Sequence, residues 1–183
     1  MKSFLKPSLA ILFAASVFMT TGCGNDDEPT PENEEELITT VRLHATPQGG
    51  GNMIMATYKD VDGPGGQAPI VNGLQLAANK VYDVRVEVLD ESKTPAEDIT
   101  QEVKEEADEH QFFYQPSTGL NLTVAYTDQD SKNLPLGITT RMTTAAASTG
   151  TLRVILKHQP GTKNNSVNTG ETDVEVTFPA TIQ

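Results

Sequence analysis

Two histidines and two glutamates have the residue types and the positions needed to bind a metal ion. Glu102, Glu106 and His110 follow one another at intervals of four, which places them on one face wherever the segment is helical. His158 ends an alternating apolar segment and has the phase of its inward-facing residues. Imidazole and carboxylate groups together suit Zn²⁺ or another first-row divalent ion. The sequence therefore predicts a metal site of His110, His158, Glu106 and Glu102 at the margin of the core.

The same residues also allow an interpretation without a metal. Each histidine can close an edge of the core through hydrogen bonds, while the glutamates solvate a helix. No spacing motif such as HExxH accompanies them. The third histidine, His44, shares its strand face with Arg42 and Thr40 and is expected to be exposed. Both interpretations of His110 and His158 remain open at this level.

Loop aspartates form a second, less complete pattern. Asp60 with Asp62, and Asp128 with Asp130, have the DxD spacing that can bind Ca²⁺, but neither loop has the Gly at position 6 and the Glu at position 12 of an EF-hand. The chain also lacks a GxSxG elbow, a GxxxxGK[ST] loop and a GxGxxG turn that opens a helix. We therefore expect a protein that is not an enzyme and has no catalytic residues.

One helical interval must position the glutamates. Residues 94–97 (TPAE) form a capping box with proline at the first helical position, which predicts a helix over about 95–109. Its apolar stripe begins with Ile99 and Val103 and continues as Glu102, Glu106 and His110, on the side expected to face a sheet. Fraying at the helix end can carry His110 into the following strand.

Most of the remaining chain alternates between apolar and polar residues, as half-buried strands do. The alternating segments lie at 41–45, 84–88, 120–126, 152–156 and 174–178, with less regular ones at 52–58, 70–76 and 137–144. About eight short strands and a single helix are typical of an antiparallel sandwich. The sequence predicts one immunoglobulin-like β-sandwich domain over residues 37–183.

The first residues of this chain of 183 resemble a bacterial export signal. Two lysines precede an uncharged apolar run at 9–19, which is shorter than the roughly 20 residues that span a bilayer and has the length of a signal-peptide core. Residues 20–23 (TTGC) resemble a lipobox and contain the only cysteine. We expect a lipoprotein signal peptide over 1–22 and lipidation of Cys23, which leaves no pair for an internal disulfide.

Charge is concentrated directly after this cysteine. Residues 24–36 carry seven carboxylates and no apolar residue besides proline, so residues 23–36 are predicted to form a disordered tether. Asp26, Asp27 and Glu28 resemble the signal that sends lipoproteins of Bacteroidota to the cell surface, although an ordinary acidic spacer facing the periplasm is the alternative. The net charge of −12 argues against nucleic acid as a partner. We expect a protein anchored in the outer membrane and exposed at the surface.

Several runs along the folded part resemble a family of small lipoproteins from Bacteroidota, flavobacteria in particular. They are TPQGGG, VDGPGGQAPIVNG, LDESKTPAEDIT, EEADEHQFFY, LKHQPG and GETDVEVTFP, and they cover nearly the whole domain. Members are commonly labelled "type 1 periplasmic binding fold superfamily protein". That label implies a two-domain α/β architecture, whereas the strand pattern predicts one small β domain.

The resemblance also implies a partner, because such lipoproteins are often encoded beside TonB-dependent outer-membrane receptors. The leading hypothesis is a surface module that captures a metal ion or metal complex for such a receptor. The alternative is an adhesion or accessory module that binds glycan or protein through the sandwich loops. An exposed platform of Tyr58, Tyr82 and Tyr114 would favour that alternative, although the chain has no tryptophan for sugar stacking.

Overall fold

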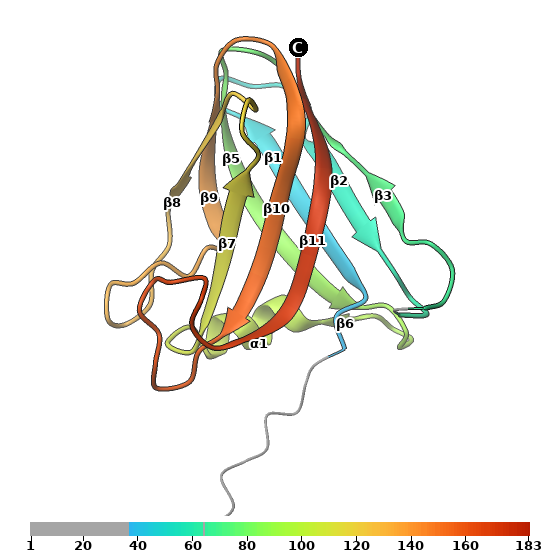
Figure 1. The fold of residues 1–183 in the computed structure, drawn as a ribbon, viewed down its shortest axis with the longest axis vertical. Coiled ribbons are helices and arrows are strands. Elements are labelled where there is room, and N and C mark those ends of the chain that lie inside the picture. The colour runs from blue at the N-terminus through green and yellow to red at the C-terminus, as the bar shows by residue number, and fades with distance from the viewer. Residues whose placement is uncertain (1–36, 64) are drawn as a thin grey trace, which may run out of the picture. The chain divides into compact units, whose positions relative to one another are not determined.

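Alternating apolar residues produce two β-sheets in the computed structural model, which describes residues 37–63 and 65–183 (Figure 1). The expected signal peptide at 1–22, Cys23 and the tether through residue 36 lie outside the described residues. Within the described ranges, no helix has the length and apolar character required to cross a membrane.

The larger sheet contains seven strands. Its hydrogen-bonded order is β3-β2-β1-β5-β9-β8, with β6 paired to β5. All of these pairs are antiparallel, and Leu43 of β1 lies opposite Val86 of β5 at the centre. The strands are β1 (Thr40–Pro47), β2 (Ile54–Lys59), β3 (Ile70–Asn72), β5 (Val81–Asp90), β6 (Glu97–Asp98), β8 (Leu122–Tyr126) and β9 (Thr139–Thr144).

The smaller sheet contains four strands in the order β4-β11-β10-β7. Only the β4–β11 pair is parallel, and the β10–β11 register shifts between Leu156 and Lys157. The strands are β4 (Leu74–Leu76), β7 (His110–Pro116), β10 (Ser148–His158) and β11 (Glu171–Ile182).

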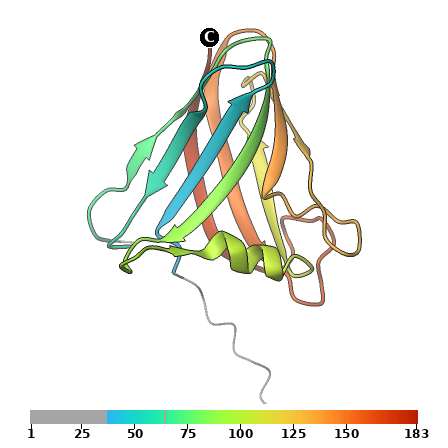
Figure 2. The same ribbon diagram turned by 180° about the vertical axis from the view of Figure 1, so that it is seen from behind.

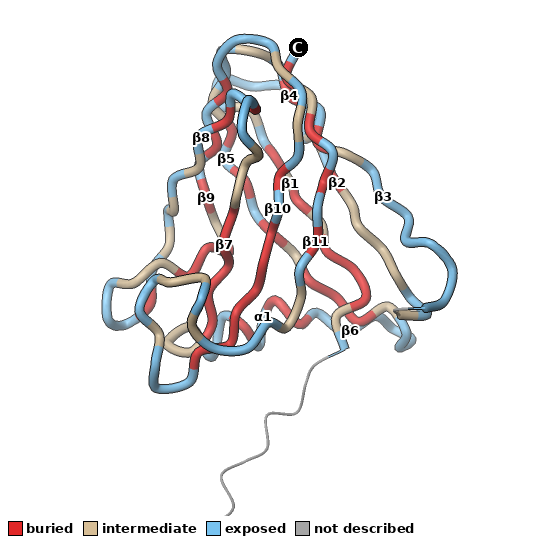
Figure 3. Tube along the Cα trace, viewed as in Figure 1, coloured by how far each residue is buried: buried red, intermediate tan, exposed pale blue. Residues whose placement is uncertain are grey.

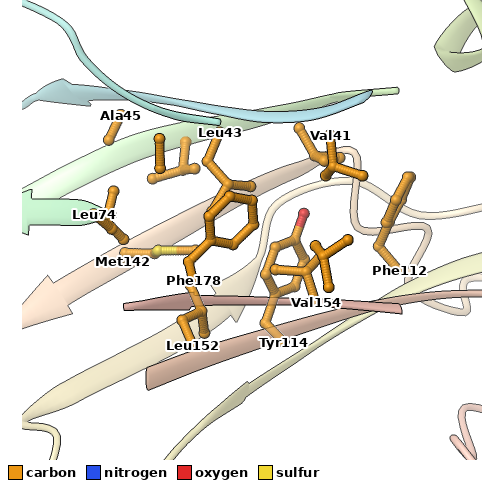
Figure 4. Packing of buried hydrophobic residues seen from close by; sticks show 14 of the residues in the cluster. Val41, Leu43, Ala45, Leu74, Phe112, Tyr114, Met142, Leu152, Val154 and Phe178 are labelled. Carbon is orange, nitrogen blue, oxygen red and sulfur yellow. The ribbon is translucent and has the colours of Figure 1, made fainter. Parts of the chain in front are cut away.

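The inner faces of the two sheets pack against each other to form one apolar core. Figure 4 shows Leu43 from the larger sheet beside Phe178 from the smaller, and both side chains are fully buried. At roughly 1.5–3 kcal/mol for each large apolar side chain removed from water, this layer stabilises the arrangement of the sheets. The protein is mainly β, and the predicted β-sandwich is confirmed.

Two details of the sandwich differ from the sequence pattern. The expected strand at 70–76 is divided into β3 and β4, which belong to different sheets. The strand β7 was not among the alternating segments, because residues 110–114 are all buried and so show no polar face.

The single helix is confirmed but is shorter than predicted. α1 (Ile99–Glu105) begins after residues 97–98, which pair with β5 and are therefore extended. Its N-cap is Asp98, whose carboxylate accepts a hydrogen bond from the Thr100 amide at 3.1 Å, so the predicted capping box at 94–97 is wrong. The helix lies across one end of the sandwich, as Figures 1 and 2 show from opposite sides.

The orientation of α1 also differs from the prediction. Ile99, Thr100 and Val103 are its buried residues, whereas Glu102 and Glu106 are exposed. The expectation that these two glutamates face the sheet is therefore wrong. The side chains of Ile99, Thr100 and Val103 carry no charge, so their burial costs less free energy than burial of a glutamate. They therefore determine which side of the helix faces inward.

Candidate metal centre

The two candidate histidines are direct neighbours across paired strands. β7 and β10 run antiparallel with His110 opposite His158, so the two rings start from backbone positions that face each other. The rings stack with their centroids 4.5 Å apart and their planes 13° from parallel. His110, the first residue of β7, is 8% exposed, and His158, the last residue of β10, is 9% exposed. Figure 3 shows the lower parts of both strands as buried. His158 faces inward, as the sequence predicts, because the alternate residues of β10 that share its face belong to the core.

A turn, rather than a helix face, brings Glu106 to His110. The helix ends at Glu105, and the Glu106 carbonyl then accepts hydrogen bonds from the amides of Glu109 at 2.9 Å and His110 at 3.2 Å. This turn leaves Glu106 Oε2 3.6 Å from His110 Nδ1. The interval of four residues therefore predicts the proximity correctly, although the backbone that produces it is not helical throughout.

Glu106, His110 and His158 form the group that could hold a metal ion. One ligand atom from each residue lies within 4.8 Å of the others. A tetrahedral ion with bonds of about 2.0–2.1 Å places its ligand atoms about 3.4 Å apart. The three atoms therefore need to approach by up to about 1.4 Å. Because the stacked rings are nearly parallel and a nitrogen lone pair lies in the plane of its ring, at least one imidazole must also turn to bind the same ion as the other.

The His110 imidazole is in the protonation state that metal binding requires. Burial, together with the adjacent His158, lowers the pKa of His110 to about 4, although the hydrogen bond to the Glu106 backbone and the Glu109 and Glu102 carboxylates act in the opposite direction. The ring is consequently neutral at pH 7. Within the described part of the chain, its buried Nδ1 has no hydrogen-bond partner. A bound cation would satisfy this nitrogen.

Two further carboxylates approach the other ring nitrogens. Asp173 Oδ2 lies 3.6 Å from His110 Nε2, and Glu109 Oε2 lies 3.5 Å from His158 Nε2. Carboxylates in this position commonly orient histidine ligands and raise their basicity. Sequence reasoning missed both. Glu109 could have been suspected as the neighbour of His110, but only the pairing of β10 with β11 brings Asp173 to the site.

Glu102 and His44 lie outside this group. Glu102 is exposed on α1 and is not one of the three residues whose ligand atoms converge, so the predicted set of four becomes a set of three. His44 lies on the outer face of the larger sheet, where its Nε2 is 3.2 Å from Glu87. Glu102 lies on the exposed face of α1, whereas His44, which was expected to be exposed, is half-buried on the outer face of β1.

The carboxylates of the loop aspartates already accept hydrogen bonds from nearby backbone amides. Asp60 and Asp62 accept hydrogen bonds from amides within their turn. Asp128 accepts from the Gly137 and Thr139 amides. Asp130 accepts from two amides and also pairs with Lys163 at 2.8 Å. These contacts explain the DxD spacing through loop structure rather than through calcium.

The described surface has a groove on the outer face of the larger sheet and a cleft beside the turn that follows α1. A groove of about 640 Å³ crosses the outer face of the larger sheet, and its Arg85 and Arg141 already pair with neighbouring carboxylates. A cleft of about 530 Å³ is lined by Glu106 and Glu109, the two carboxylates that approach His110 Nδ1 and His158 Nε2. The tyrosine platform is not formed, since Tyr82 and Tyr114 are buried and Tyr58 packs against the core.

No protein-family model, curated protein or solved structure matches the chain. The resemblance to small lipoproteins of Bacteroidota therefore stays a prediction. The stacked pair of His110 and His158 with Glu106 beside it is the observation on which a function can be argued.

Proposed function

We propose that this protein is a lipoprotein of the outer membrane that captures a divalent transition metal ion and is not an enzyme. Its ligands are Glu106, His110 and His158, and the ion is Zn²⁺ or another first-row dication. Cys23 carries the lipid anchor, and the acidic residues Asp26, Asp27 and Glu28 direct the protein to the cell surface. A TonB-dependent receptor is the proposed recipient of the metal.

The histidine pair is the single observation that carries the metal-binding proposal. Two imidazoles and a carboxylate are a frequent ligand set for zinc, with a further position open for water or a fourth ligand. A pair of buried rings with an unpartnered Nδ1 costs stability unless something binds that nitrogen. The cleft lined by Glu106 and Glu109 brings solvent to the two carboxylates that approach the rings.

Calorimetric titration of the full-length protein in detergent with Zn²⁺ tests the proposal. We expect binding by the wild type and a loss of affinity of about 100-fold or more in His110→Ala and in His158→Ala, because each removes a ligand. His44→Ala is the matched control, since it removes the one histidine that lies away from the site. Absence of binding by the wild type, or equal affinity in all three variants, would overturn the proposal.

The anchoring part needs a separate measurement. Cys23→Ala is expected to abolish incorporation of labelled palmitate and to release the protein from the membrane fraction, because a chain without acyl groups loses about 0.8 kcal/mol per buried methylene. Alanine at positions 26–28 is expected to leave lipidation intact but to remove the protein from the reach of protease added to whole cells. Continued protease sensitivity of that triple variant would contradict the role of the acidic residues.

A further inference from the structure

Negative charge surrounds the two carboxylates, Glu106 and Glu109, that approach the histidine rings. The cleft of about 530 Å³ that they line has no basic side chain among its described lining residues. Its acidic lining residues are Glu105, Glu106, Asp108, Glu109 and Asp130. Ser131 and Gln129 add polar groups, and only Ala107 is apolar.

The nearby lysines do not neutralise this cleft. Lys163 is 1% exposed, and its ammonium group is enclosed between Asp130 Oδ2 at 2.8 Å and the Ala107 carbonyl at 2.8 Å. The charges of Lys163 and Asp130 therefore neutralise each other. Lys132 is half-exposed and lies 3.9 Å from Asp108, so it offsets one carboxylate at most. Glu105, Glu106 and Glu109 remain without a cation among the described ion pairs, apart from the two histidine rings.

A carboxylate also lies at the other ring nitrogen of His110. Asp173 Oδ2 is 3.6 Å from His110 Nε2, and the Asp173 side chain is only 16% exposed. An anion brought against His110 would face this group as well as Glu106. Like charges at such short distances repel each other, and burial strengthens this repulsion.

The histidines also leave little room for a ligand larger than an ion. Their rings are 4.5 Å apart and about nine-tenths buried, so a bulky chelate cannot reach His110 Nδ1 without displacing Glu106. The cleft lacks the apolar lining that holds a macrocycle such as haem, whose propionates would also be repelled.

Building on the proposed metal-binding function, we infer that the site takes the bare hydrated dication and excludes anionic metal chelates and haem. The outer carboxylates attract the ion, and the buried imidazoles replace its water molecules. An organic carrier of the metal is therefore left outside the protein.

Equilibrium dialysis of the full-length protein in detergent, with radiolabelled zinc and radiolabelled citrate, tests this inference. We expect stoichiometric retention of zinc and no retention of citrate. Retention of citrate in step with zinc would overturn the inference but would leave metal binding intact. Failure to retain zinc supplied without citrate would overturn the proposed function, and this inference with it.

A charge series at Glu105 tests the electrostatic part, because Glu105 lines the cleft but is not a proposed ligand. Glu105→Gln and Glu105→Lys are expected to lower zinc affinity about two-fold and about three-fold at 0.1 M salt, as one unit charge at about 10 Å from a dication predicts. Asp83→Asn and Asp83→Lys, on the outer face of the larger sheet, are the matched controls. Equal effects of the two series would overturn the role assigned to the cleft.

Discussion

His158 lies where two backbone segments approach each other closely. Gly170 faces it at the end of the β10–β11 hairpin with a φ of 72°, a conformation that L side chains rarely adopt. A Cβ at this position would lie 2.1 Å from the His158 carbonyl oxygen. The hairpin can therefore close beside the histidine only because residue 170 is glycine.

Gly170→Ala is expected to lower the free energy of unfolding by about 2 kcal/mol or more, since it adds a backbone clash to the cost of positive φ. It should also weaken zinc binding by moving His158. Gly161→Ala is the matched control, because Gly161 also has positive φ but a Cβ there would meet no atom within 4 Å. Urea unfolding measures the free energy of unfolding of both variants. Equal losses of stability in the two would contradict the role given to the close approach at Gly170.

At the level of elements, α1 determines where the chain delivers Glu106. The seven-residue helix is too short to be stable alone, so its packing through Ile99 and Val103 and its cap at Asp98 must hold it. Its last turn then leads directly into the turn at 106–109 and into β7. A shift of the helix start would move Glu106 relative to His110.

Asp98→Ala is expected to lower the free energy of unfolding by about 1 kcal/mol, because the Thr100 amide loses its acceptor. Zinc affinity should fall as well, since the helix end becomes less well fixed. Glu97→Ala, which removes only an exposed ion pair with Lys93, serves as the control and should leave both properties unchanged. Thermal unfolding and zinc titration measure both properties. Equal stability and equal zinc affinity in the two variants would contradict this role of the cap.

Across the whole molecule, one buried ion pair joins three connections at the end of the sandwich that carries the site. Asp130 belongs to the loop between β8 and β9, and Lys163 to the loop between β10 and β11. Lys163 also donates to the Ala107 carbonyl in the turn that follows α1. Burial alone would raise the pKa of Asp130, but Lys163 and the Leu134 and Lys132 amides outweigh it and hold this pKa below its ordinary value.

Asp130→Asn is expected to cost about 3 kcal/mol at pH 7, because it leaves the Lys163 charge buried without its partner. Since the folded pKa lies below the ordinary value of 3.8, the stabilisation is present above about pH 4 and is lost as the pH falls through the folded pKa. The gap between wild type and variant in urea unfolding should therefore narrow below pH 4. A gap that stays constant to pH 2, or one no larger than that of the exposed Asp83→Asn, would contradict this assignment.

Periodicity in the sequence was sufficient to predict the sandwich, the existence of a single helix and the inward phase of His158. Alternation reports which face of a strand is buried, and that is a local property of the chain. It failed for β7, where every residue from 110 to 114 is buried, and at 94–97, where pairing with β5 keeps the following residues extended. At β7, burial by strands distant in sequence overrides the local preference, whereas at 94–97 the short hairpin with the end of β5 does so.

The sequence by itself determined which residues have metal-binding chemistry, namely His110, His158 and Glu106. Only the tertiary structure decided that they meet, because the antiparallel register of β7 and β10 places residues 48 positions apart opposite each other. The orientation of α1 excluded Glu102, and the pairing of β10 with β11 brought in Asp173. The physical reason is that the sequence specifies the type of each side chain directly. Its neighbours in space depend instead on strand pairing, and burial of the core selects that pairing.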